Sequence, residues 1–297
     1  MSTRLSAMAQ WAFPPTHRSH ALADFVALTK PGIVVSNVLM TAVGLTLAPA
    51  APWTVASAAM VGTALLIASC GALNMALEAS TDARMGRTAG RPVADGRVSA
   101  VAAAVFGAAL LVAGIALLAS FTNVAATSLG AFACFVYVLL YTPLKRRTWA
   151  AVPIGAIAGA LPPVIGWSAA GGEPGLVVSL LFAALFVWQM PHFLAIGIRR
   201  WRDYADAGLA IGPTPQNFGR SIFWIRATCL SLTAVTGGLV AVASAGYAFV
   251  FLGLGAALWM LLAALRPAHD PACWSRRVFL ASLAYLPSFT LGAFLPV

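Results

Sequence analysis

Apolar runs of about 20 residues, long enough to cross the hydrocarbon core of a bilayer as helices, recur along the whole chain. The sequence is 61% hydrophobic and only 9% charged, a balance that excludes a soluble globular domain. We therefore predict an all-α, polytopic membrane protein with nine transmembrane helices. The nine segments are 25–48, 53–78, 99–119, 122–141, 151–168, 176–196, 221–243, 245–264 and 278–296.

The loops between these segments alternate in charge. Loops 79–98, 142–150, 197–220 and 265–277 are long or basic, whereas the intervening loops are short and contain no Lys or Arg. Positive residues favour the cytoplasmic side, so the pattern predicts a cytoplasmic N-terminus and a C-terminus outside. This asymmetry also explains the net charge of +10 without a nucleic-acid partner. Seven of the eight acidic residues lie on the same predicted face, which indicates a working surface.

The first residues do not read as a cleavable secretory signal, because they lack a short apolar core followed by a cleavage site. We predict a cytoplasmic tail at 1–24 and a single intramembrane domain at 25–297. The tail is only weakly similar to a mitochondrial transit peptide. We therefore expect the inner (plasma) membrane of a bacterium, with the mitochondrial inner membrane as the alternative.

The most informative polar residues are Asn74, Glu78 and Asp82, which follow one another at intervals of four. Residues at this spacing share one face of a helix, so they form a column of oxygen donors. Mg²⁺ prefers oxygen donors and commonly joins one or two carboxylates to substrate phosphates. The alternative is a helix end whose acids pair with Arg84 and Arg87. Glu78 argues against it, because it ends a long apolar run where a carboxylate is costly without a partner or a metal.

Arginine residues follow this column directly, and Arg87 and Arg91 are the candidates for binding phosphate oxygens. A second acidic pair, Asp203 and Asp206, follows the sixth predicted span. Two carboxylate sites on one face would permit two metal ions to hold one diphosphate. The alternative for the second pair is a positive-inside loop with incidental acids.

Tyr141, Lys145 and Arg146 form a third group, at the end of the fourth predicted span. Lys145 can act as a point charge on phosphate, and Tyr141 can donate a hydrogen bond. The alternative is that the basic residues only stop translocation and that the tyrosine belongs to an interfacial aromatic belt.

His192 lies in the segment WQMPHF, where Pro191 can break the helix and free backbone groups. A lone histidine near the end of a span is most often a hydrogen-bonded packing residue. It can also be a metal or heme ligand or a proton shuttle. Spacing does not decide between these roles.

Several segments together resemble the intramembrane prenyltransferase superfamily and, within it, the heme O synthases (protoheme IX farnesyltransferases). The superfamily motif Asn-x-x-x-Asp/Glu-x-x-x-Asp is matched by Asn74, Glu78 and Asp82. The segments typical of the heme O synthases are DARMGRTAGRP at 82–92, YTPLKRRT at 141–148, GAIAGALPPVIGW at 155–167, WQMPHF at 188–193 and DYADAG at 203–208, preceded by LTKP at 28–31.

The resemblance implies nine helices around a central cavity, with Mg²⁺ as cofactor. It implies that farnesyl diphosphate and heme B are converted to heme O and diphosphate in a lipid bilayer. Heme A synthase or terminal oxidase assembly proteins are the implied partners. The residues implied to be catalytic and metal-binding are Asn74, Glu78, Asp82 and Asp203. Those implied to bind substrate are Arg87, Arg91, Tyr141, Lys145, Arg146 and His192.

Two other functions compete with this interpretation. One is a polyprenyl transferase of the same superfamily that acts on an aromatic quinone precursor, against which the RTAGRP and WQMPHF segments argue. The other is a transporter. Transporters place ionisable residues near the bilayer midplane, whereas the polar residues here gather near one predicted face.

Overall fold

The computed structural model describes residues 21–243 and 246–295, and this part of the chain is built from helices. Eight helices are long and apolar enough to cross a membrane, and a ninth span results when the bent pair at the start is counted as one. The predicted all-α architecture with nine spans is confirmed in these terms. Most of the predicted tail and the C-terminal Pro296-Val297 lie outside the described residues, and the orientation of the termini stays a prediction.

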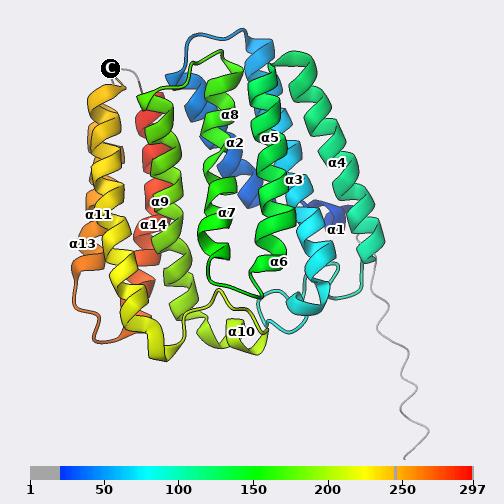
Figure 1. Cartoon of the computed structure of the whole chain (residues 1–297), viewed down its shortest axis with the longest axis vertical. Coiled ribbons are helices and arrows are strands. Elements are labelled where there is room, and N and C mark those ends of the chain that lie inside the picture. Colours follow the sequence, from blue (N-terminus) through cyan, green and yellow to red (C-terminus); the bar gives the residue numbers. More distant parts are fainter. Residues whose placement is uncertain (1–20, 244–245, 296–297) are drawn as a thin grey trace, which may run out of the picture.

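Helices of very different length and regularity make up the bundle (Figure 1). A short helix, α10 (Trp201–Asp206), lies outside the spans. The spans are, in chain order, α1 (Ala21–Leu28) with α2 (Pro31–Leu47), α3 (Trp53–Asp82), α4 (Ala100–Phe121), α5 (Val124–Phe135) continued by η1 (Val136–Tyr141) and α6 (Thr142–Leu144), α7 (Ala151–Ala160) with α8 (Pro162–Ala169), α9 (Leu176–Arg199), η2 (Pro215–Asn217) with α11 (Phe218–Val242), α12 (Tyr247–Phe249) continued by η3 (Val250–Leu254) and α13 (Gly255–Leu265), and α14 (Pro271–Phe294).

The first span differs from the prediction of one uninterrupted segment at 25–48. Helix α1 already begins at Ala21, and a bend of 45° separates it from α2. Lys30 occupies the break with a left-handed backbone (φ 53). The following Pro31 disfavours helical backbone at the residue before it, yet suits the first position of the next helix. Left-handed geometry costs a non-glycine residue about 1–2 kcal/mol, so the surrounding packing must hold Lys30 in place.

Proline acts differently in two other spans. The fifth span is divided at Leu161, because Pro162 and Pro163 have no N–H to continue the backbone hydrogen bonds. Helix α9, in contrast, runs through Pro191 without ending. The expectation that Pro191 breaks its helix is therefore wrong, because membrane helices tolerate proline where neighbouring groups satisfy the freed carbonyls.

Close backbone contacts fix α2 against α8. A Cβ atom at Gly44 would lie 1.9 Å from the Pro163 carbonyl oxygen, and one at Gly166 would lie 2.0 Å from the Thr41 carbonyl oxygen. Small residues permit such approach between helices in membranes. Helices α9, α11, α13 and α14 bury a second apolar core beside this pair. The ends of α3, α6 and α9, together with α10, lie at one end of the bundle (Figure 1).

Candidate active site

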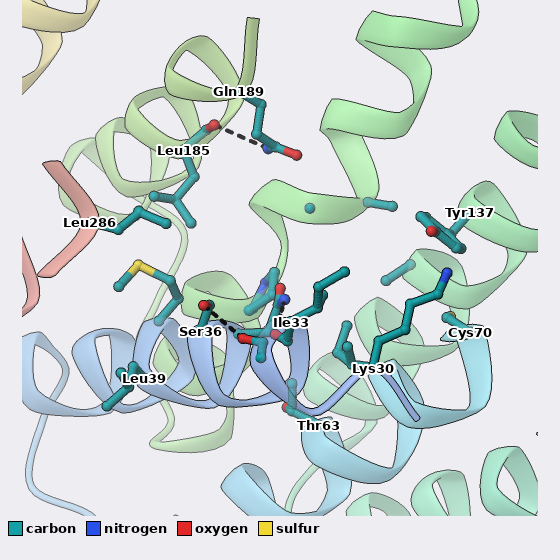
Figure 2. A pocket seen from close by; sticks show the side chains of 18 of the residues that line it. Lys30, Ile33, Ser36, Leu39, Thr63, Cys70, Tyr137, Leu185, Gln189 and Leu286 are labelled. Carbon is teal, nitrogen blue, oxygen red and sulfur yellow. Dashed lines mark hydrogen bonds between the residues drawn. The ribbon is translucent and has the colours of Figure 1, made fainter. Parts of the chain in front are cut away.

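A cavity of about 800 Å³ lies inside the bundle, as the predicted architecture requires. In Figure 2, Lys30, Ile33 and Leu39 line one side of it, and Leu185 and Gln189 lie across the cavity on α9. Most of its wall is apolar, with Lys30, Tyr137 and Tyr141 among the few polar groups. The chamber can therefore hold a long apolar group while polar groups contact one end of it.

The predicted oxygen-donor column exists, because α3 continues to Asp82 and carries all three residues on one helix. Asn74 and Glu78 are 2% and 1% exposed. The Asn74 side-chain amide donates to Glu78 Oε2 over 2.7 Å, and Lys145 Nζ forms an ion pair with the same oxygen. Lys30 Nζ donates to Asn74 Oδ1 over 2.7 Å. The Lys145 ammonium thus contacts the buried carboxylate directly, and the Lys30 ammonium is linked to it through Asn74.

The second carboxylate oxygen of Glu78 has no such partner. Glu78 Oε1 is enclosed by protein and forms no hydrogen bond with the part of the chain that the structure describes. Buried polar atoms are nearly always paired, so an unpaired carboxylate oxygen fits a ligand that supplies positive charge. Within residues 21–243 and 246–295, no three His, Cys, Asp or Glu side chains group together. Mg²⁺ needs no such group, because substrate phosphates and water complete its coordination.

Asp82 pairs with Arg91 rather than with Arg84 or Arg87. The Arg91 guanidinium lies 2.7 Å from Asp82 Oδ2, and the Thr88 hydroxyl donates to the Asp82 carbonyl over 2.9 Å. Arg84 and Arg87 are exposed. The loop after α3 therefore folds back on the end of its own helix, and it brings Arg91 to the column.

The segment after α9 packs against this loop. Met85 forms a buried cluster with Ala207 and Leu209, with Tyr204 packed against it. Burial raises the pKa of Tyr204, and the positive charge of Arg87 opposes the shift. Asp203 of α10 lies 3.6 Å from the Arg200 guanidinium and is partly exposed. The two acidic segments therefore meet at the same end of the bundle.

Of the third predicted group, Tyr141 and Lys145 lie at the site, whereas Arg146 does not contact it in the described part of the chain. Lys145 joins the column through Glu78; burial lowers its pKa and the carboxylate opposes that shift. Its Nζ also lies 5.6 Å from the centre of the Tyr141 ring, which lines the cavity. Arg146 is exposed. The Ala210 amide donates to the Lys145 carbonyl over 3.0 Å, which ties this corner to the segment after α10.

Sequence reasoning missed two residues of this network. Thr142 receives a 3.3 Å contact from the Asn74 amide, and Lys30 approaches Asn74 from the break between α1 and α2. Thr142 carries no signal of its own in the sequence. Lys30 does, because it is the only charged residue within the apolar segment 25–48.

His192 lies on the wall of the cavity, near one end of α9. Its Nδ1 is 2.8 Å from the Ser282 hydroxyl of α14. The imidazole stacks on Trp188, with ring centres 4.9 Å apart, and the Phe279 ring lies 5.2 Å away. The predicted packing role and a ligand role are both compatible with this position.

Arg97 holds the loop 83–99 to the first helix. Its Nε donates to Asp24 Oδ1 over 2.9 Å, its NH2 group donates to the Gly90 carbonyl over 3.0 Å, and it also pairs with Asp95. The hydrogen bond that Arg97 donates to Asp24 is the main reason that the pKa of Arg97 is raised. Together with the Arg91–Asp82 ion pair, these contacts fix the loop that carries Arg87 and Arg91 to both α1 and α3.

Replacing Arg97 by alanine is expected to loosen this loop. Hydrogen bonds to charged groups contribute about 1.5–3 kcal/mol, so amide exchange in 83–98 should accelerate by about tenfold or more. Hydrogen–deuterium exchange with mass spectrometry measures the effect. Arg84→Ala is the matched control, because Arg84 is exposed and its side chain bonds, among the described residues, only to the Ser80 carbonyl at the end of α3. Equal exchange in the two variants would contradict the assignment.

Comparison with known proteins agrees with this arrangement. A protoheme IX farnesyltransferase from Marinomonas sp. is 36% identical over 265 residues, covering 87% of this chain and 90% of the relative. A protoheme IX farnesyltransferase from Sorangium cellulosum is 41% identical over 231 residues, which cover 77% of this chain and 82% of the relative. The solved structure of a UbiA homolog from Archaeoglobus fulgidus, bound to GPP and Mg²⁺, superimposes with a TM-score of 0.68. The two sequences are 16% identical, and the superposition covers 92% of this chain and 100% of the homolog.

The sequence model of the UbiA prenyltransferase family matches residues 37–283. This range contains the donor column, the segment with Asp203 and Asp206, and the cavity wall formed by α9. It ends within α14, at Leu283, and begins after Lys30. With a family match over most of its length, close agreement with named relatives and the same fold, this chain belongs to the UbiA prenyltransferase family.

Proposed function

We propose that this protein transfers the farnesyl group of farnesyl diphosphate to a vinyl group of heme B, giving heme O and diphosphate. The observation that carries the proposal is the buried Glu78 carboxylate, flanked by Lys30, Asn74 and Lys145 beside a large apolar cavity. Relatives at 36–41% identity are protoheme IX farnesyltransferases, which supports this choice of donor and acceptor.

The reaction requires polar groups that bind the diphosphate and an apolar chamber that encloses the farnesyl chain. Asn74, Glu78 and Asp82 would hold Mg²⁺, with Asp203 contributing to a second ion. Bound Mg²⁺ neutralises charge on the diphosphate as it leaves. The GPP and Mg²⁺ bound to the Archaeoglobus fulgidus homolog support this use of the fold.

The cations of this chain act on the same leaving group. Lys145, Arg91 and Arg87 bind diphosphate oxygens, assisted by Lys30 and by the Tyr141 hydroxyl. Groups that meet charge as it develops in the transition state supply the largest catalytic effect. Arg146 lies on the exposed side of this corner, where it adds positive charge at the entrance.

The cavity controls the fate of the carbon chain. When the allylic C–O bond breaks, its electron pair leaves with the diphosphate and a farnesyl cation remains. Apolar walls exclude water that would capture this cation too early. The heme vinyl group then supplies two electrons for the new carbon–carbon bond. Water adds to the cation formed beside the porphyrin and loses a proton, which leaves the hydroxyl group.

We infer that the enzyme works in the cell's inner (plasma) membrane with its polar end toward the cytoplasm, as the distribution of positive residues supports. A water-soluble diphosphate donor would then enter from the cytoplasmic side. Heme O carries a long farnesyl chain that favours the bilayer over water, so direct transfer to heme A synthase or to a terminal oxidase assembly protein is the expected next step.

A reconstituted assay tests the proposal. Purified protein in nanodiscs is supplied with farnesyl diphosphate, Mg²⁺ and either heme B or 4-hydroxybenzoate, and the products are identified by mass spectrometry. Heme O is the expected product, and the double variant Glu78→Gln, Asp82→Asn should form none above background. Prenylated 4-hydroxybenzoate without heme O would overturn the proposed acceptor in favour of a quinone precursor.

A further inference from the structure

The hydrogen bonds around His192 determine which of its nitrogens is free. The Ser282 hydroxyl lies 2.6 Å from the Phe279 carbonyl, which can only accept, so the hydroxyl hydrogen is used there. The same oxygen lies 2.8 Å from His192 Nδ1 and must therefore accept a hydrogen from it. Nδ1 carries the proton, and Nε2 carries the free electron pair.

This nitrogen is available to a ligand. Nε2 has no hydrogen-bond partner among the described residues, and it does not belong to their fully enclosed, unpaired polar atoms. His192 itself lines the chamber. The ring cannot turn freely, because Trp188 stacks on it, and the Trp188 indole N–H donates to the Ser282 carbonyl over 2.9 Å. A neutral imidazole oriented through Nδ1 and free at Nε2 is the usual form of a histidine that binds a metal.

A second residue of α9 continues the same face. Arg199 follows His192 by seven residues, which places the two on one side of the helix about 10 Å apart along its axis. The Arg199 guanidinium lies 5.2 Å from the centre of the Phe279 ring, the ring that also lies against His192. Arg199 is exposed and takes part in none of the ion pairs formed within residues 21–243 and 246–295. Its planar donors suit a carboxylate.

We propose that the acceptor porphyrin is held by two contacts on α9, with its iron bound to Nε2 of His192 and its propionate carboxylates bound to Arg199. The inference rests on the proposed function, which makes heme B the acceptor. The vinyl groups of heme B lie on the side of the ring away from the propionates. With the propionates at the end of α9, the vinyl side enters the cavity that Lys30 and Tyr141 also line.

The iron contact is tested by spectroscopy on the full chain in nanodiscs, without farnesyl diphosphate. Ferric heme B should bind with the absorption and EPR signature of histidine ligation. His192→Ala should lose that signature and bind at least about tenfold more weakly, and added imidazole should restore the signature. His269→Ala, an exposed histidine between α13 and α14, is the matched control and should behave as the parent protein. Iron-free protoporphyrin IX should bind the parent and His192→Ala equally.

A separate variant tests whether Ser282 orients the imidazole ring of His192. Ser282→Ala removes the acceptor for Nδ1 but leaves the imidazole in place. Loss of such a partner commonly weakens metal binding by about 10–100-fold, so the histidine signature should persist at higher heme concentration. This separates a positioning role of Ser282 from the ligand role of His192.

The propionate contact is tested with the dimethyl ester of heme B. The parent protein should bind the ester at least about tenfold more weakly than heme B. Arg199→Gln should bind the two with equal affinity and leave the iron signature unchanged. Arg202→Gln, on the short helix that follows, is the control and should keep the discrimination between the acid and the ester.

Two results would overturn the inference: an unchanged iron signature and affinity in His192→Ala, or full discrimination against the ester in Arg199→Gln. Heme O formation by the same preparation of parent protein is measured separately. If heme O forms while either result is found, the inference fails and the proposed function stands. If heme B binds as expected but no heme O forms under any supplied condition, the proposed function fails.

Discussion

Replacing Glu78 by glutamine is expected to lower kcat/KM for heme O formation by about a thousandfold, the loss typical when a group that stabilises transition-state charge is removed. The amide keeps the size of the side chain but removes its negative charge. Glu78 has an enclosed oxygen with no hydrogen-bond partner in the described structure, so this carboxylate has an unpaired oxygen with which to bind a cation. The assay is initial rate against farnesyl diphosphate concentration at saturating Mg²⁺.

The single variant leaves the Lys145 ammonium without its carboxylate, and breaking a buried ion pair costs about 3–5 kcal/mol. Impaired folding must therefore be separated from impaired catalysis. The double variant Glu78→Gln, Lys145→Gln removes both charges and should recover thermal stability but not activity. Glu173→Gln makes the same chemical change at an exposed site and should leave the rate unchanged. A folded Glu78→Gln protein with normal kcat/KM would remove Glu78 from the reaction.

Removing divalent cations is expected to lower turnover by at least about a hundredfold, and Mg²⁺ should restore it. Without the cation, the diphosphate would face the Glu78 and Asp82 carboxylates with only the Lys and Arg side chains to offset their repulsion. Mg²⁺ suits one or two carboxylates together with phosphate oxygens, whereas the larger Ca²⁺ prefers more ligands at longer distance. Ca²⁺ should therefore restore less activity than Mg²⁺ at equal concentration.

Chelation should affect the two substrates differently. Binding of heme B, followed by its absorption spectrum, should not change with EDTA, because His192 and Arg199 lie outside the donor column. Binding of farnesyl diphosphate should weaken, and Glu78→Gln should raise the Mg²⁺ concentration needed for half-maximal rate. Full turnover in EDTA, with residual Mg²⁺ verified as absent, would contradict the proposed use of the column.

Local spacing predicted a large part of the site. Asn74, Glu78 and Asp82 lie on one face because a helix returns to the same face about every four residues, and no tertiary information is needed for that. The placement of Asp82 within the helix is confirmed, since α3 extends four residues beyond the predicted end of the apolar run. The identity of the partners was not predictable. Arg91, nine residues after Asp82, reaches it only because the loop turns back through Thr88.

Hydropathy did not predict the break between α1 and α2 at Lys30. Composition alone makes 25–48 one apolar segment, and length alone makes it one span. The local conflict between Lys30 and Pro31 was visible in the sequence, but its consequence was not. A left-handed lysine between two helices is held there by contacts with α3, among them the hydrogen bond to Asn74, 44 residues away.

By itself, the sequence determined the membrane-spanning helical architecture, the column of oxygen donors and the family, because apolar length, helical periodicity and short motifs are properties of neighbouring residues. Only the tertiary structure decided which cations flank Glu78, which arginine pairs with Asp82 and which nitrogen of His192 is free. The Lys145 and Ser282 contacts join residues 67 and 90 positions apart, respectively, and depend on how whole helices pack. Helix packing is set by the summed fit of many side chains, which no local pattern encodes.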